Sequence, residues 1–219
     1  QLKEKHLVQM FDRYATYNGS NPYKTSGIMS LIQHLENNIG TFIPNRGMVE
    51  ITNSLFKLAK RQGVEFLFNT RINKIVTKNN KVLGVNSNSK FYESEILVSN
   101  SDVYYTYKKL LGDINKASKL SKIERSSSAV IFYWGISRKF EMLDLHNIFF
   151  SNDYKSEFEH IFEKKSVFED PTVYINITSK DVITDAPKNS ENWFVMINVP
   201  SDCGQDWEKI VKELKAYTI

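Results

Sequence analysis

The sequence predicts a mixed α+β fold, and three observations carry that prediction. Four runs rich in aromatic and β-branched residues follow residue 126, which is typical of strands in one mostly antiparallel sheet. Segments with helical spacing accompany these runs, so helices should cover one face of the sheet. A separate helix–turn–strand unit is expected within Thr41 to Thr70. With 219 residues, of which 41% are hydrophobic, the chain can bury a substantial core.

The chain is organised around an amphipathic helix that follows Pro44 and Gly47. The loop that contains Pro44 and Gly47 either packs tightly or touches a ligand. Proline lacks a backbone hydrogen-bond donor, and glycine allows another group to come close to the backbone. Apolar side chains then recur at three- and four-residue steps, so one helix face should be buried. These positions are Met48, Ile51, Leu55, Leu58 and Ala59. Gly63 should end the helix in a left-handed conformation, and Val64 to Phe68 has strand composition.

Upstream of this unit, Gln1 to Phe11 and Ile28 to Leu35 have helical patterns, with a polar, tyrosine-rich loop at residues 12–22 between them. His34 lies in the second helix, and no second ligand stands at metal-binding spacing from it. We therefore propose no metal site from the sequence.

Downstream, residues 71–77 and 82–85 alternate apolar and polar side chains around a short polar turn, which predicts a hairpin. Ile96 to Val98 is an apolar run of buried-strand type that ends in Ser-Asn-Ser-Asp. The last residue of that stretch is Asp102. It either faces a ligand crevice at the strand end or caps a helix at residues 103–111.

The C-terminal half should hold the antiparallel sheet. The four expected strands are Ala129 to Gly135, Asn147 to Phe150, Thr172 to Thr178 and Trp193 to Val199. Helical spacing at Asp153 to Phe162 and Asp206 to Tyr217 predicts the helices that cover it.

The composition limits the kinds of partner that we expect for this chain. The net charge of +4 comes from 29 basic and 25 acidic residues that are scattered, so nucleic acid is not an expected partner. Cys203 is the single cysteine of the sequence, so an internal disulfide is excluded. We expect its side chain to fill a small space in the core. No apolar stretch has the length of a transmembrane helix, so we expect a soluble or peripheral protein. Both ends read as cut, which suggests a segment of a longer protein.

Several catalytic signatures are absent from the sequence. Nine glycines stand singly, without G-x-G-x-x-G or a P-loop, so the chain holds no self-contained phosphate-binding turn. There is also no G-x-S-x-G elbow and no H-E-x-x-H motif, so hydrolase and metalloenzyme functions have no support.

Four stretches together resemble the phytoene desaturase family of carotenoid and diapocarotenoid dehydrogenases. They are TYNGSNPY from Thr16, FIPNRGM from Phe42, GVEFLFNTRINKI from Gly63 and VSNSDVYYTYKKLLG from Val98. The similarity spans nearly the whole chain, including FYWGI at Phe132 to Ile136, and corresponds to the middle of such an enzyme. It does not include the family's N-terminal dinucleotide-binding unit or its C-terminal flavin motif.

The resemblance implies an FAD-dependent enzyme whose flavin and substrate domains exchange chain. Residues 44–112 would belong to the FAD-binding domain, lacking its Rossmann βαβ unit, while 1–43 and 113–219 would belong to the substrate domain. The matching flavin-side positions are Gly47, Ile72 and Asn100, and Asp102 is the candidate acid–base residue. Arg46 replaces the first glycine of the family's Pro-x-Gly-Gly-Met. An arginine there has less dihedral freedom, which affects the expected flavin contact.

The implied reaction removes two hydrogens from an apolar polyene, with FAD as the hydride acceptor. The implied setting is a cytoplasmic, peripheral membrane surface, because the substrate dissolves in lipid. This segment by itself is not expected to retain FAD. Two alternatives stay open: another flavin reaction such as isomerisation, saturation or amine oxidation, and a non-enzymatic module that binds an apolar ligand.

Overall fold

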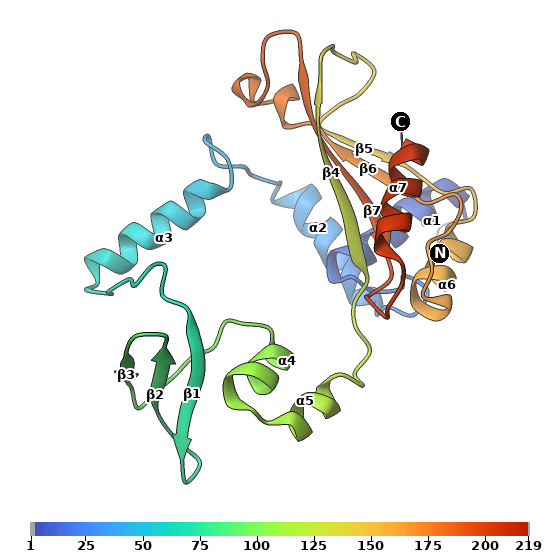
Figure 1. Cartoon of the computed structure of the whole chain (residues 1–219). Helices are drawn as coiled ribbons and strands as arrows, with labels where there is room; N and C mark the ends of the chain where they lie inside the picture. The colour runs from blue at the N-terminus through green and yellow to red at the C-terminus, as the bar shows by residue number, and fades with distance from the viewer. Residues whose placement is uncertain (1–2, 219) are drawn as a thin grey trace. The chain divides into compact units, whose positions relative to one another are not determined.

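The computed structural model describes residues 3–218, which form two compact units (Figure 1). The first, here called the sheet unit, comprises the described parts of Gln1–Gly40 and Arg125–Ile219. The second, the hairpin unit, is Thr41–Glu124. The chain therefore leaves the sheet unit and later returns to it. Helices and antiparallel sheets occur together, which confirms the predicted α+β class.

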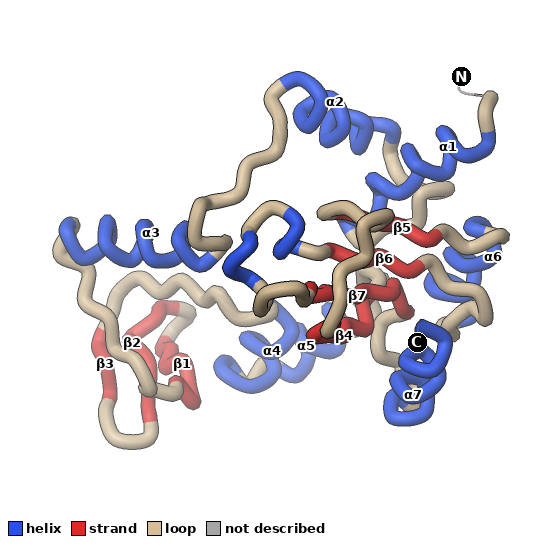
Figure 2. Tube along the Cα trace, turned by 90° about the horizontal axis from the view of Figure 1, so that it is seen from above, coloured by secondary structure: helices blue, strands red, loops and turns tan. Residues whose placement is uncertain are grey.

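The sheet unit is built on four antiparallel strands in the order β4-β7-β6-β5 (Figure 2). They are β4 (Ser128–Ile136), β5 (His146–Phe149), β6 (Val173–Asn176) and β7 (Glu191–Val199). Each predicted strand is present, with small shifts at its ends. The connections β4–β5 and β6–β7 lie at the same end of the sheet (Figure 1).

One face of this sheet, the inner face, carries the main core. Val195 and Ile197 are fully buried there, and Leu214 of the C-terminal helix packs against them. Strand alternation puts every second residue of β6 and β7 on this side, so apolar side chains line it continuously. The prediction that a helix covers one face of the sheet is confirmed for the C-terminal helix.

The helices of the sheet unit are α1 (Lys5–Asp12), α2 (Ser30–Asn38), α6 (Tyr154–Glu159, continued as a π-helical turn over His160–Lys164) and α7 (Trp207–Thr218). The loop expected between α1 and α2 contains a 3-10 helix at Arg13–Asn18. The hydroxyls of Tyr14 and Tyr17 both donate to the Glu36 carboxylate, at 2.9 and 3.0 Å, which ties this turn to α2. The N–H of Ser127 donates to the Gly19 carbonyl, so the turn also lies beside the start of β4.

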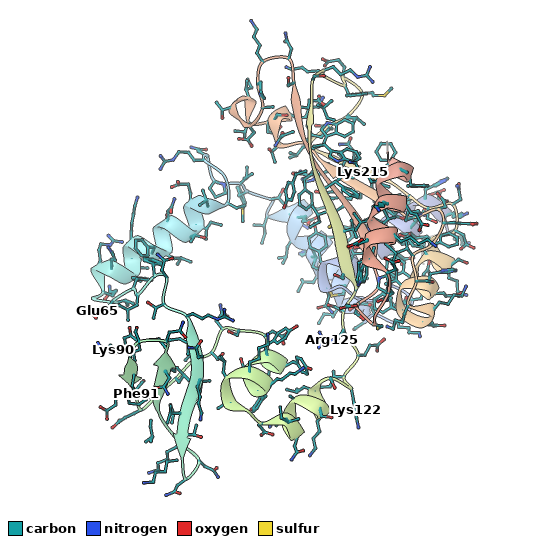
Figure 3. The ribbon with its side chains drawn as sticks, in the orientation of Figure 1. Glu65, Lys90, Phe91, Lys122, Arg125 and Lys215 are labelled. Carbon is teal, nitrogen blue, oxygen red and sulfur yellow. The ribbon has the colours of Figure 1, made fainter. Side chains whose placement is uncertain are left out.

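The hairpin unit contains the three-stranded antiparallel sheet β1-β2-β3 and three helices. Their bounds are α3 (Val49–Arg61), β1 (Ile72–Lys78), β2 (Lys81–Ser87), β3 (Phe91–Glu93), α4 (Val103–Tyr105, continued as a π-helix over Thr106–Leu111) and α5 (Ile114–Leu120). The predicted hairpin is confirmed. The third strand was not expected; it begins at Phe91, beside Lys90 (Figure 3).

The helix α3 forms where its periodicity predicts, and Gly63 follows it with φ +82°. The prediction that its apolar face is buried is wrong for this structure, because Leu55 is 61% exposed and α3 has no buried residue. The packing involves a different side of the helix: Phe56 contacts Phe66 at 4.5 Å between ring centroids. Phe68 contacts both rings, so the segment after α3 packs on the helix, pairs with no neighbouring strand, and does not form the strand predicted at residues 64–68.

Two further expectations need correction. Ile96 and Val98 are 83% and 87% exposed and belong to no strand, although their composition predicted a buried one. An apolar run becomes a strand only where a neighbouring strand offers hydrogen bonds, and the hairpin unit offers none at this point. Cys203 is exposed and is not a core filler, because it lies in the polar turn that precedes α7.

Candidate functional site

The face of the β4-β7-β6-β5 sheet opposite the core, here called the outer face, carries a band of rings across all four strands. Tyr133 of β4 contacts Phe194 of β7 edge to face at 5.5 Å between ring centroids. Phe194 contacts Tyr174 of β6 at 6.5 Å, and Tyr174 stacks on His146 of β5 at 6.1 Å. The strand register places these side chains on one face, and Tyr133 is 79% exposed.

Apolar side chains lie next to this band of rings on the outer face. Ile131 pairs with Met196, and Met196 pairs in turn with Tyr174 across the next strand. Ile148 of β5 pairs with Tyr174 on its other side. Burial raises the pKa of the Tyr174 hydroxyl, which keeps it neutral. The strand side chains of the outer face are thus mostly aromatic and aliphatic, which suits an extended apolar molecule, and the Arg13 cation lies near enough to Tyr174 to oppose the effect of burial on its pKa.

A buried ion pair supports the end of the sheet where the long connections meet. Lys180 Nζ lies 2.9 Å from Glu191 Oε1, which also accepts a hydrogen bond from the N–H of Phe140. The other carboxylate oxygen accepts one from the Trp193 indole at 2.9 Å. Burial by itself raises the pKa of Glu191, but these donors outweigh it and hold the pKa below its usual value. The Glu191 carboxylate therefore holds both the β4–β5 connection and the β6–β7 connection to β7.

The predicted flavin-side glycine has a conformation that suits a ligand-contacting loop. Gly47 has φ +82°, and a Cβ added there would meet no atom within 4 Å. The neighbouring Arg46 turns toward the helix: its guanidinium lies 3.1 Å from the carboxylate of Glu50, one turn along α3, and its side chain is 76% exposed. The backbone at Gly47 is therefore open on its free side.

The other predicted positions lie elsewhere in the hairpin unit. Ile72 is half-buried at the start of β1 and pairs with Ser87. Asn100 is exposed in the segment before α4. Asp102 is also exposed, and its carboxylate accepts hydrogen bonds from the N–H groups of Tyr104 and Tyr105 at 2.9 and 3.3 Å. It caps α4, which was one of its two expected roles.

No hydrogen bond in the described chain joins Gly47, Ile72, Asn100 and Asp102 to one another. The first three present backbone or an exposed amide and remain candidates for flavin contact. Asp102 remains the acid–base candidate, although its cap hydrogen bonds already occupy one carboxylate oxygen.

Within residues 3–218, no group of three or more His, Cys, Asp or Glu side chains is arranged to hold a metal ion. None of the helices described there is both long and apolar enough to cross a bilayer.

The outer face is the part of the site that sequence reasoning did not single out. The run AVIFYWG is apolar at nearly every position, so it lacks the alternation that would show which side chains share a face. Pairing settles the question, because Tyr133 aligns with Phe194 while Trp134 aligns with Trp193 toward the core. The partial alternation in TVYINIT was the available signal, since only Tyr174 and Asn176 break its apolar run.

Comparison with known proteins shows what the chain is related to. It is 57% identical over 209 residues to the 1-hydroxycarotenoid 3,4-desaturase of Flavobacterium sp. (strain P99-3), covering 95% of this chain and 43% of that protein. The chain is a homologue of carotenoid desaturases. Other relatives are the phytoene desaturase of Neurospora crassa (30% identical, covering 98% of this chain and 39% of that protein) and the 4,4'-diaponeurosporene oxygenase of Staphylococcus aureus (30% identical, covering 91% of this chain and 41% of that protein).

The chain thus spans less than half the length of the curated relatives it matches. No family model matches it. Among solved structures, an oxidoreductase from Methanosarcina mazei resembles this chain with a TM-score of 0.67 at 12% identity, covering 100% of this chain and 49% of that one. At that identity the likeness concerns the fold alone. The resemblance found in the sequence is confirmed.

Proposed function

We propose that this chain is part of an FAD-dependent oxidoreductase that desaturates a carotenoid. The observation that carries the proposal is the 57% identity to a carotenoid desaturase over 95% of the chain. The outer face supports it, because its strands present aromatic and aliphatic side chains that a long polyene can contact. That relative is a 1-hydroxycarotenoid desaturase, so a hydroxylated carotenoid is the first substrate to test.

In this proposal the outer face holds the polyene. Tyr133, Phe194 and Tyr174 offer ring edges and faces across the sheet, and Ile131 and Met196 extend the apolar contact. Burying a polyene there excludes water from both surfaces, and the hydrophobic effect supplies the affinity. The rigid antiparallel sheet keeps the rings in fixed positions, which limits the orientations the polyene adopts.

FAD, when bound, would supply hydride acceptance, and three positions of the hairpin unit would contribute to holding it. Gly47 fits because its backbone is open, Ile72 through its backbone at the start of β1, and Asn100 through its exposed amide. Asp102 is the proposed proton-handling residue. These residues would make only part of the contacts to FAD. A dinucleotide-binding turn, which this sequence does not contain, would make the others.

The proposed location is a membrane surface on the cytoplasmic side, since the proposed substrate dissolves in lipid. The helix α2 supports this, because Ile28, Leu31 and Leu35 near and along it are all exposed. Flotation of the full-length protein with lipid vesicles tests it, with Leu31→Glu as the variant. Equal flotation of wild type and variant would count against α2, and no flotation at all would count against peripheral attachment.

The activity is tested with the full-length protein, FAD and carotenoid-containing vesicles, by mass spectrometry of the product. Desaturation removes two hydrogens from the polyene. An unchanged mass with altered geometry would indicate isomerisation, and a gain of hydrogen would indicate saturation. Binding without conversion, in protein that carries FAD, would indicate the non-enzymatic module.

The role of the outer face is tested by Tyr133→Ala, with Phe149→Ala as the matched control. Phe149 belongs to the same sheet and is 51% exposed, but it lies on the opposite face. Loss of one aromatic contact weakens binding by about 1–2 kcal/mol, so KM should rise about tenfold for Tyr133→Ala only. Similar effects of the two substitutions would remove the outer face from the proposal.

A further inference from the structure

A groove of about 520 Å³ lies at the end of the outer face where the β6–β7 connection folds over it. Its lining includes Tyr133 and Phe194, the two rings that begin the aromatic band, together with Trp134 and Trp193 at the same end of β4 and β7. Its polar lining, here called the rim, includes Asn176, Thr178 and Asp185. The apolar surface therefore continues into a pocket whose far side offers hydrogen-bonding groups.

The hydrogen bonds of the rim leave two acceptors available. Thr178 Oγ1 donates to Asp185 Oδ2 at 2.6 Å and accepts from the Asn192 amide at 2.7 Å. The Asn176 amide nitrogen donates to the carbonyl of Leu145 at 3.0 Å, and because a carbonyl only accepts, this bond fixes the orientation of the amide. Within residues 3–218, neither Asn176 Oδ1 nor Asp185 Oδ1 has a hydrogen-bond partner.

The charge of the groove discriminates between kinds of polar ligand. Asp185 is exposed and carries its negative charge on the rim, whereas the nearby Glu191 is paired with Lys180. A carboxylate on the ligand would be repelled by Asp185. An entirely apolar end would cover two acceptors without satisfying them, which is unfavourable. A hydroxyl group donates one hydrogen bond to either acceptor, and a bond to a carboxylate is charge-assisted.

We propose that this groove binds the hydroxyl-bearing end of a polyene whose apolar part lies along the outer face. Asp185 and Asn176 accept the hydrogen bond from the hydroxyl, and the rings of Tyr133 and Phe194 hold the adjoining carbons. This assignment rests on the proposed function for the identity of the ligand class. It adds a specificity site, which makes the protein prefer hydroxylated polyenes over unsubstituted polyenes of the same length.

The test measures binding and turnover separately in full-length protein with FAD. Two polyenes of equal length, with and without a terminal hydroxyl, are titrated while tryptophan fluorescence is recorded. The same pair is then used as substrates in vesicles. Wild type should bind the hydroxylated polyene about tenfold or more tightly, since a hydrogen bond to a charged acceptor contributes about 1.5–3 kcal/mol.

The variants are Asp185→Asn and Asn176→Leu, with Asp181→Asn as the control. Asp185→Asn keeps an acceptor for Thr178 and removes only the charge, so it guards against loss of the turn. Asp181 is exposed in the same connection and does not line the groove. The preference for the hydroxylated polyene should fall at least about threefold in Asp185→Asn and about tenfold in Asn176→Leu, and it should persist in Asp181→Asn.

The outcomes separate this inference from the proposed function. A hydroxyl preference in binding that the variants abolish supports the groove even if no polyene is converted. Conversion of both polyenes without preference overturns the groove and leaves the desaturase proposal standing. Equal losses on both polyenes, or binding of neither, also overturn the groove.

Discussion

The ammonium group of Lys180 lies 2.9 Å from the carboxylate of Glu191, whose side chain is 2% exposed. Removing the cation leaves a buried carboxylate without its main partner, and such losses are strongly destabilising. We expect Lys180→Met to lower the free energy of unfolding by about 3 kcal/mol. Lys188→Met, in the same connection and exposed, is the control and should change it little. Denaturant titration measures both, and a loss below about 1 kcal/mol for Lys180→Met would contradict the prediction.

The same pair predicts a pH effect. The pKa of Glu191 is lower in the folded protein than its usual 4.5, so its stabilising contribution is present above pH 4.5 and is lost as the pH falls through the folded value. Lys180→Met should therefore reduce the acid sensitivity of unfolding below pH 4.5. If the free energy of unfolding of wild type and of Lys180→Met fell in parallel with pH, the ion pair would not be the source of this acid sensitivity.

Glu157 should behave with the opposite sign. It is 1% exposed, and burial raises its pKa above the usual value although Thr172 donates two hydrogen bonds to it. A raised pKa in the folded state gives stability that is full below pH 4.5 and is lost as the pH rises through the folded value. The advantage of wild type over Glu157→Gln should shrink as the pH rises from 4 to 7. Thermal melts across this range measure it, and an advantage that grows would be contrary to expectation.

Gly84 in β2 is expected to be intolerant of any side chain. It has φ +148°, and an added Cβ would collide with the carbonyl oxygen of Tyr92 in the neighbouring strand. Gly84→Ala should lower the free energy of unfolding by about 3 kcal/mol. Gly112→Ala is the matched control, because Gly112 also has positive φ, at +70°, but open space around it. About 1 kcal/mol is expected there, and equal effects would show that the collision is relieved.

Arg46 is expected to have little influence on the cofactor. Its pairing with Glu50 directs the side chain along α3, which is the arrangement in which the loop keeps its path. In full-length protein, Arg46→Gly should change FAD affinity less than about twofold, whereas Gly47→Ala should weaken it several-fold through strain at φ +82°. A several-fold effect of Arg46→Gly would mean that the arginine turns toward the flavin.

The purified segment of 219 residues should carry no FAD. The sequence contains no dinucleotide-binding turn, so the pyrophosphate would have no backbone cradle. The visible absorbance of the purified protein measures this, because a bound flavin is yellow. A stoichiometric yellow cofactor would contradict it.

Local patterns in the sequence were sufficient for much of the secondary structure. The periodicity of α3 and the alternation in the β1–β2 hairpin each depend on neighbours within a few residues, and both elements form as predicted. The sheet strands were also found, because aromatic and β-branched residues favour pleated structure whatever they pack against.

Burial was predicted less well, because it depends on what lies opposite a side chain. The pattern at Leu55 shows that one helix side is apolar, but it carries no information about a partner for that side. The same holds for Ile96 and Val98. The outer face was missed for a related reason: an all-apolar strand hides its two sides until a partner strand fixes the register, as Phe194 does for Tyr133.

The hydrogen bond between Ser127 and Gly19 has a consequence for how the protein is made. During synthesis, the segment containing Gly19 leaves the ribosome well before its partner, because residues 41–124 must be translated in between. The hairpin unit can complete its contacts in that interval, while α1 and α2 wait for β4 to appear. Slow translation through residues 41–124 should thus prolong the time in which the apolar side chains of α2 are available to chaperones.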